Sequence, residues 1–397
     1  MRKSVLITLL LVLLLSSFVF ANTPTAGGGV GIIIDVEDFD PLIWLDHDSR
    51  VVRHNPANGG AILIQRIANY AFEGEQIIWR VLVMDKNGIE KIRDVYTTIG
   101  ASQGPGNDIE ANCDMTSDTD VESFNAFIGE ERLTTFDPNT MRIYSCAFAV
   151  ETPASMYGEY FLTSEVEDLD GNLATLDEHE FWYLNPVIAL SISGEIDFGT
   201  VRPGTLAYSD TLLIENDADS GSGVLLYMTI SGSDFYDPEP SGAKCPETNR
   251  LRLNTGGSNL ILGIDPLTGE ILSYNPGDQG TCDSDGSLNV ENEVDFICYY
   301  ATNGGYHTGN DWVRDDDEGY VGIPYETGSK SRRIPIITGA TGIDTPRNLV
   351  EFGTAQYFGG SAIPPGDEIA ITFRLRLPEP CNGDFSEGQI YFWGTAI

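Results

Sequence analysis

Short runs that alternate apolar with polar residues follow one another along the first half of the chain. They are rich in Ile, Val, Tyr, Phe and Trp and are bounded by turn residues, a pattern typical of β-strands. The expected strands are Leu42 to Leu45, Ala61 to Ile67, Gln76 to Met84, Ile89 to Thr98, Thr140 to Val150, Gly158 to Val166 and Phe181 to Leu184. One helix candidate lies around Val121 to Glu131. So many short strands predict a β-sandwich over residues 42–186.

Two polar segments between these runs predict tight turns. Asp85-Lys86-Asn87-Gly88 contains an Asn-Gly pair, which suits the positive φ angles of a type I′ hairpin turn. Asp168-Leu169-Asp170-Gly171-Asn172 follows a strand-like run in the same way. The stretch from Gly158 to Asn172 resembles the penultimate strand and turn of extracellular immunoglobulin-like domains, and Trp79 on a central strand is compatible with that resemblance. The resemblance implies an immunoglobulin-like first sandwich.

A second β-rich domain is expected after Asn185-Pro186, because the residue before a proline favours extended chain. Alternating segments recur at Ile188 to Ser193, Ser209 to Asn216, Gly223 to Ile230, Glu368 to Leu377 and Gln389 to Gly394. Strands from the start and the end of a domain come together in Greek-key and jelly-roll sandwiches. The predicted fold class is therefore all-β, with two tandem sandwiches: immunoglobulin-like over 42–186 and jelly-roll-like or Greek-key-like over 187–397.

Residues 1–21 have the pattern of a secretory signal peptide. Arg2 and Lys3 precede an apolar run from Val5 to Leu15, and Ala21 is a small residue at the expected cleavage point. An uncleaved membrane anchor is the alternative, but the apolar run is short for a bilayer. The mature protein is therefore expected to be secreted or at the cell surface, where disulfides persist.

Residues 22–41 combine a Gly-rich tether with a short apolar run, Ile32 to Val36, that should not remain in water. Two alternatives stay open for this run. It can pair locally as the first strand of its own domain, or it can be donated to an open sheet edge of another copy. Because head-to-tail donation is a heterologous contact, it would propagate into filaments unless it closed a ring.

Six cysteines in an exported chain predict disulfides and not a zinc site, since no Cys-x-x-Cys pair with neighbouring histidines is present. Six cysteines allow 15 connectivities. The domain division leaves Cys113 with Cys146, and the short loop between Cys282 and Cys298 favours their pairing. That assignment leaves Cys245 with Cys381.

The formal net charge is −38, with 60 acidic residues scattered along the chain and 22 Lys and Arg. Nucleic acids and anionic lipids require basic surface, so neither is an expected partner. A solubilising surface is the preferred interpretation of the acidity, ahead of a salt-rich habitat or cation binding.

The stretch from Ile196 to Gly232 contains a Phe-Gly-x-Val-x-Pro-Gly turn, Phe198 to Gly204, followed by alternating strands. It resembles the opening strands of TasA-like or camelysin-like secreted β-sandwich proteins. The two-domain layout as a whole resembles surface proteins of small uncultivated archaea. These resemblances imply a structural or adhesive surface protein, and the TasA-like or camelysin-like resemblance implies assembly into extracellular filaments.

No catalytic constellation is recognisable in the sequence. Gly100-Ala101-Ser102-Gln103-Gly104 matches Gly-x-Ser-x-Gly, but Pro105-Gly106 follows where a nucleophile elbow needs a helix. The four histidines, His47, His54, His179 and His307, lack metal-pair spacing and are interpreted as surface or turn residues. A non-enzymatic protein without a required cofactor is therefore expected.

Calcium is the most credible ion for this chain, because it binds carboxylate and carbonyl oxygens. Candidate ligands are Asp168, Asp170 and Asn172 in one turn and Asp283, Asp285 and Asn289 in another. Neither segment completes an EF-hand loop, and Asp-Gly turns are also common in hairpins.

The candidate binding cluster is Trp312, Asp316 and Tyr320, where aromatic rings and acids could contact a sugar. Its plainer interpretation is a solvated loop, since consecutive acids repel one another. A secreted carbohydrate-binding or carbohydrate-cleaving protein is the alternative function.

Overall fold

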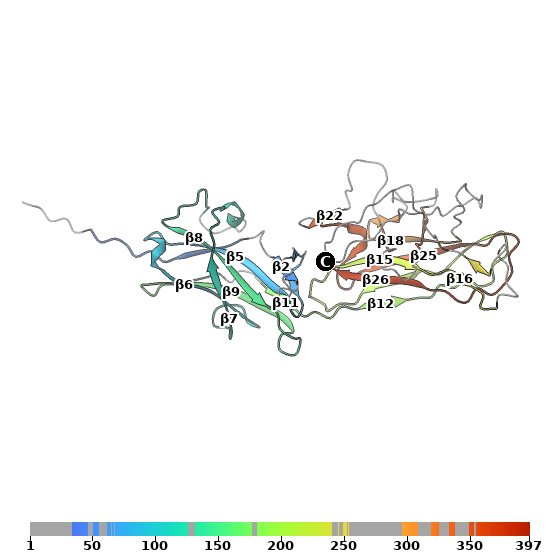
Figure 1. Cartoon of the computed structure of the whole chain (residues 1–397), viewed down its shortest axis with the longest axis horizontal. Helices are drawn as coiled ribbons and strands as arrows, with labels where there is room; N and C mark the ends of the chain where they lie inside the picture. The colour runs from blue at the N-terminus through green and yellow to red at the C-terminus, as the bar shows by residue number, and fades with distance from the viewer. Residues whose placement is uncertain are drawn as a thin grey trace, which may run out of the picture. The chain divides into compact units, whose positions relative to one another are not determined.

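A run of short β-strands accounts for almost all regular structure in the computed structural model of the chain (Figure 1). The structure describes residues 34–46, 51–54, 62–64, 66, 68–125, 132–176, 181–239, 245, 249–251, 253, 296–308, 319–324, 333–337, 349–352 and 355–397. Within these residues the helical segments are single 3-10 turns, η3 (Ile89–Lys91), η4 (Glu122–Asn125) and η6 (Gly359–Ser361). None of the described segments is a helix with the length and hydropathy needed to cross a bilayer. The all-β prediction is confirmed.

The helix expected around Val121 to Glu131 is not formed over its described part. Only η4 is helical there, and residues 126–131 lie outside the described residues. The side-chain amide of Asn125 donates to the carbonyls of Val121 and Leu133 and accepts from the Leu133 amide. These bonds link the last residue of η4 to Leu133, farther along the chain.

The first eleven strands form one hydrogen-bonded sheet in the order β3-β2-β5-β8-β7-β6-β9-β11-β4, with β1 on β5 and β10 on β9. They are β1 (Leu42–Leu45), β2 (Val51–His54), β3 (Ile62–Ile64), β4 (Tyr70–Ala71), β5 (Gln76–Met84), β6 (Ile92–Gly100), β7 (Ile109–Met115), β8 (Met141–Ala149), β9 (Gly158–Asp168), β10 (Leu173–Leu176) and β11 (Phe181–Leu184). Strand β7 pairs with both β6 and β8, and so joins two layers of this sheet, one containing β5 and β8 and the other containing β6, β9 and β11. Trp79, Trp182 and Val166 pack in the core between those layers.

The remaining strands form further sheets on residues 190–396. They are β12 (Leu190–Ser193), β13 (Leu206–Tyr208), β14 (Leu212–Asn216), β15 (Leu226–Gly232), β16 (Phe235–Tyr236), β17 (Arg250–Leu251), β18 (Ile297–Asn303), β19 (Tyr306–His307), β20 (Val321–Gly322), β21 (Ile334–Pro335), β22 (Leu349–Phe352), β23 (Ala355–Phe358), β24 (Ala362–Ile363), β25 (Glu368–Arg376) and β26 (Ile390–Ala396). A seven-stranded sheet contains β12-β14-β25-β18-β19 with β13 and β20, and a four-stranded sheet contains β21-β15-β24 with β26. Strands β16–β17 and β22–β23 form two further pairs.

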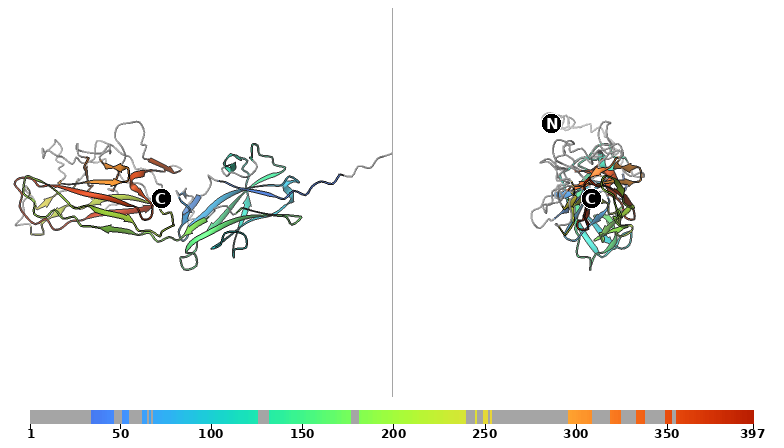
Figure 2. Two further views of the ribbon diagram at one scale, coloured as in Figure 1. Left: turned by 180° about the vertical axis from the view of Figure 1, so that it is seen from behind. Right: turned by 90° about the vertical axis from the view of Figure 1, so that its right-hand side faces the viewer.

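Strands from the two ends of this second group lie side by side, as the jelly-roll or Greek-key expectation requires. The late strand β25 pairs with β13 and β14, and the last strand β26 pairs with β15 along its whole length. In Figure 2 the red strands accordingly run beside the yellow-green ones. Among the described strands, no ladder joins β1–β11 to β12–β26.

The tight turn expected at Asp85 to Gly88 forms, with Asp85 Oδ1 accepting the Asn87 amide at 2.7 Å. It is not of the expected type I′, because Gly88 is the only residue in it with a positive φ. It also closes no hairpin, since β5 pairs with β1, β2 and β8, whereas β6 pairs with β7 and β9. The turn and η3 therefore carry the chain from one layer to the other. The turn at Asp168 to Asn172 does close a hairpin, with Leu173 opposite Glu167.

Residues 34–38 form no strand. The described part of Ile32 to Val36 is therefore not a strand, and the sheet with which this run pairs stays a prediction. Residues 22–33 and the expected signal peptide, residues 1–21, lie outside the described residues. Residues 39–397 form one compact unit, and the predicted boundary at Asn185-Pro186 falls between β11 and β12 within it.

Candidate functional site

The outer face of the seven-stranded sheet gathers aromatic side chains from several strands. Side chains alternate between the two faces of a strand, so register identifies those that share a face. Tyr299 and Phe373 lie directly opposite each other and are buried in the core. Tyr300 on β18 therefore projects to the other face. Tyr208 on β13 shares that face, because it is opposite Arg374 on β25, the residue after Phe373.

Four rings form a continuous row on this outer face. Ring centroids are 6.0 Å apart between Tyr208 and Tyr320 and 5.8 Å apart between Tyr320 and Tyr300. The row continues to His307 on β19, whose ring centroid is 6.0 Å from that of Tyr300. Tyr300 Oη and His307 Nδ1 are 3.1 Å apart and form a hydrogen bond. These separations are within the range of favourable aromatic contacts. Tyr208, Tyr300, Tyr320 and His307 are called the ring row below.

Arg374 supports the ring row from within the sheet. Its side chain is on the outer face, yet the residue is only 3% exposed. The guanidinium carbon lies 4.5 Å from the centroid of the Tyr320 ring, a cation–π distance. The Arg374 contact therefore fixes the orientation of the ring at the centre of the row.

Tyr320 is the member of the predicted binding cluster that the structure describes, and it is half-buried in the ring row. Trp312 and Asp316 fall in a part of the chain that the structure does not describe. Sequence reasoning did not name Tyr208, Tyr300 or Arg374 as site residues, and it interpreted His307 as a surface or turn residue. Their only sequence signal was alternation within strands, and alternation does not reveal which strands are neighbours.

The candidate calcium turn closes on itself through hydrogen bonds. Asp168 is 1% exposed. Its Oδ1 accepts the amides of Asp170 and Asn172 at 2.9 and 2.7 Å, and its Oδ2 accepts the Asn172 side-chain amide at 2.8 Å. Asp170 forms an ion pair with Lys91. Burial alone would raise the pKa of Asp168, but the hydrogen bonds from Asn172 and Asp170 outweigh it and hold that pKa below its ordinary value.

The structure thus brings Asp168, Asp170 and Asn172 together in one turn. Both carboxylate oxygens of Asp168 already accept protein hydrogen bonds, and the turn is satisfied as it stands. The other candidate ligands, Asp283, Asp285 and Asn289, are not among the described residues.

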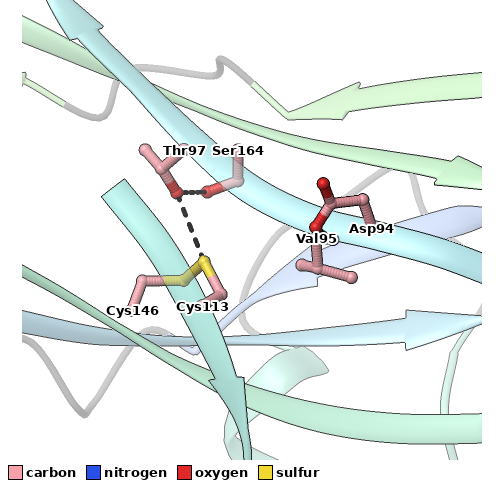
Figure 3. The surroundings of a disulfide bond; sticks show 6 residues. All are labelled: Asp94, Val95, Thr97, Cys113, Cys146 and Ser164. Carbon is pink, nitrogen blue, oxygen red and sulfur yellow. Dashed lines mark hydrogen bonds between the residues drawn. A yellow bond between two sulfur atoms is a disulfide. The ribbon is translucent and has the colours of Figure 1, made fainter. Parts of the chain in front are cut away.

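Two of the three expected disulfides are present among the described residues. Cys113 on β7 is directly opposite Cys146 on β8 and bonded to it, with their Cα atoms 4.1 Å apart. Thr97 Oγ1 lies 3.8 Å from the Cys113 sulfur and 3.0 Å from Ser164 Oγ, as Figure 3 shows. The disulfide thus covalently reinforces the seam where β7 joins the two layers.

The second disulfide joins Cys245 to Cys381 across 136 residues of chain. Cys298 lies buried on β18 and is disulfide-bonded. Its expected partner Cys282 falls outside the residues that the structure describes.

The Gly-x-Ser-x-Gly segment lacks the geometry of a nucleophile elbow. Strand β6 ends at Gly100, and residues 101–108 form a loop with no helix. The Asn107 side chain donates to the carbonyls of Ser102 and Gly104 and folds the loop back on itself. The serine is therefore part of an ordinary connection between β6 and β7.

Comparisons with known proteins return no family. No family model matches the chain, and no curated protein matches it by sequence. Among solved structures, the chain is similar to the C-terminal domain of the antigen I/II polypeptide BspA of Streptococcus agalactiae, with 11% identity, a TM-score of 0.28, and coverage of 90% of this chain and 97% of that one. It is also similar to a DUF4466 family protein of Parabacteroides merdae, with 11% identity, a TM-score of 0.21, and coverage of 79% and 97%. Similarity this low supports no inference about function.

Proposed function

We propose that the protein is a non-enzymatic secreted or cell-surface protein with a structural or adhesive role. Disulfides support this placement, because they persist in oxidising compartments outside the cytoplasm. Cys113–Cys146 and Cys245–Cys381 each join a pair of cysteines within a β-rich part of the chain. Such bonds stabilise the folded state of a protein outside the cytoplasm.

The observation that carries a self-assembling role is the largely apolar, β-branched run Ile32 to Val36, whose described residues 34–36 form no strand. Such a segment gains by pairing with the sheet edge of another copy, since main-chain hydrogen bonds provide affinity and alternate side chains provide specificity. Donation of Ile32 to Val36 from copy to copy would give oligomers that grow with concentration.

Light scattering and electron microscopy of the protein from Asn22 onward test this proposal. We expect oligomers whose size increases with concentration, and folded monomers after deletion of residues 22–36. The matched control deletes residues 22–31 only, which removes the Gly-rich tether and keeps the apolar run. A full-length protein that is monomeric at all concentrations would refute self-assembly.

A further inference from the structure

The ring row has the properties of a binding surface that the self-assembly proposal does not use. We propose that the outer face of the seven-stranded sheet, centred on Tyr208, Tyr320, Tyr300 and His307, binds a neutral polysaccharide. This inference rests on the proposed surface role and names the ligand class for its adhesive part.

The first support is rigid placement. The four rings lie on β13, β18, β19 and the residue before β20. Main-chain ladders join β13 to β25, and join β18 to β19, β20 and β25. The opposite face of this sheet is core, with Ile371, Phe373 and Tyr299 buried against the rest of the cluster. A surface fixed in this way loses little conformational entropy on binding.

The second support is the chemistry of the rings. Tyr208 is 49% exposed at one end of the row, and the other three rings are half-buried. A tyrosine presents a flat apolar body together with a polar hydroxyl. A pyranose is complementary to it, because one face consists of C–H groups while hydroxyls project from the rim. A row of rings matches a polymer better than a single sugar.

The third support is charge, which selects a neutral ligand over an acidic one. The protein carries a net charge of −38, so a polyanion approaching it meets long-range repulsion. Arg374 does not offset this repulsion at the surface, since it is 3% exposed and packs against the Tyr320 ring. Arg374 is therefore a positioning residue for Tyr320, and the ligand contacts are made by the rings.

Affinity electrophoresis in gels containing a soluble neutral polysaccharide tests the inference. A mixed-linkage β-glucan, a galactomannan and a glucomannan serve as neutral probes, and alginate serves as the polyanion. We expect retardation by at least one neutral probe and none by alginate. Tyr208→Ala should weaken retardation about tenfold, the scale of one lost stacking contact. Tyr208→Phe should keep it within about twofold, because the flat ring remains.

The matched control is Tyr306→Ala. Tyr306 is 38% exposed and precedes His307 on β19, so its side chain points to the other face. Equal losses for Tyr306→Ala and Tyr208→Ala would overturn the inference, as would a wild-type protein retarded by none of the neutral probes. Unchanged thermal unfolding of Tyr208→Ala establishes that the variant is folded.

The two proposals fail separately. Oligomers without polysaccharide retardation would refute the ring row as a glycan site and leave self-assembly intact. Retardation of a strictly monomeric protein by a neutral polysaccharide would refute self-assembly and leave the ring row intact as a glycan site.

Discussion

Removing the two described disulfides should destabilise the protein unequally. Cys245–Cys381 closes a loop of 136 residues and Cys113–Cys146 a loop of 33. In the chain-entropy model, the constraint on the unfolded chain is about 5 kcal/mol for the longer loop and about 3.7 kcal/mol for the shorter one. The double variant Cys245→Ala with Cys381→Ala should therefore lose about 1.3 kcal/mol more than Cys113→Ala with Cys146→Ala.

The two variants form a matched pair. Each replaces one buried cysteine, Cys146 at 0% or Cys245 at 1% exposure, and one half-buried cysteine. The destabilisation caused by the lost side-chain volume is therefore similar in the two variants. The difference between their free energies of unfolding then reflects the difference in loop length. Urea unfolding without reductant, followed by fluorescence and circular dichroism, gives the free energy of each transition. A larger loss for the 113–146 variant would refute the entropic reasoning, and would indicate that the seam between the two layers dominates instead.

Three further predictions concern buried polar groups. Arg80→Ala should cost about 3 to 5 kcal/mol, because it removes the guanidinium whose Nε lies 2.7 Å from the fully buried Asp46 carboxylate. Arg93→Ala, at an exposed pair, should cost under about 1 kcal/mol in the same denaturant assay. Asn216→Ala should cost about 3 kcal/mol, since the fully buried amide donates to two carbonyls and accepts one backbone amide; a loss below 1 kcal/mol would contradict this. Because the folded pKa of Asp168 lies below its ordinary value of 3.8, its contribution is present above that pH and is lost as the pH falls through the folded pKa. Asp168→Asn should flatten that part of the acid-unfolding curve. Millimolar calcium should raise the melting temperature of the unaltered protein only slightly. A large rise in melting temperature that Asp168→Asn abolishes would establish a calcium site.

Strand positions were largely predictable, because alternation is a local property. The bounds of β1, β5 and β11 are those expected from the sequence, and those of β6, β8, β9 and β25 differ by one to three residues. Strands β7 and β18, of seven residues each, were not expected. Short strands such as β4, with two residues, and β10, with four, are too brief to show a period. Their places are set by the partners they meet after the chain has folded.

Strand partners were less predictable than strands. The segment Asp85 to Gly88 has the chemistry of a hairpin turn, and the turn forms. Yet Trp79 on β5 pairs with Cys146 on β8, far along the chain, because its apolar side must be buried in the core between the layers. Turn chemistry fixes the local backbone, whereas burial of the two faces of a strand decides its neighbour.

The ring row shows the same limit for a functional surface. Tyr208, Tyr300 and Tyr320 are far apart in sequence, and each alone is an unremarkable strand or turn residue. They meet because β13 and β18 both pair with β25 and because β20 pairs with β18. No periodicity within one segment encodes that register.

The run Ile32 to Val36 shows what strand propensity leaves undetermined. Its β-branched composition favours extended chain, but an isolated strand has no ladder to satisfy its backbone groups. In its described part, residues 34–36 form no strand. Strand propensity therefore specifies an extended conformation for this run, but it does not specify which sheet edge would pair with it.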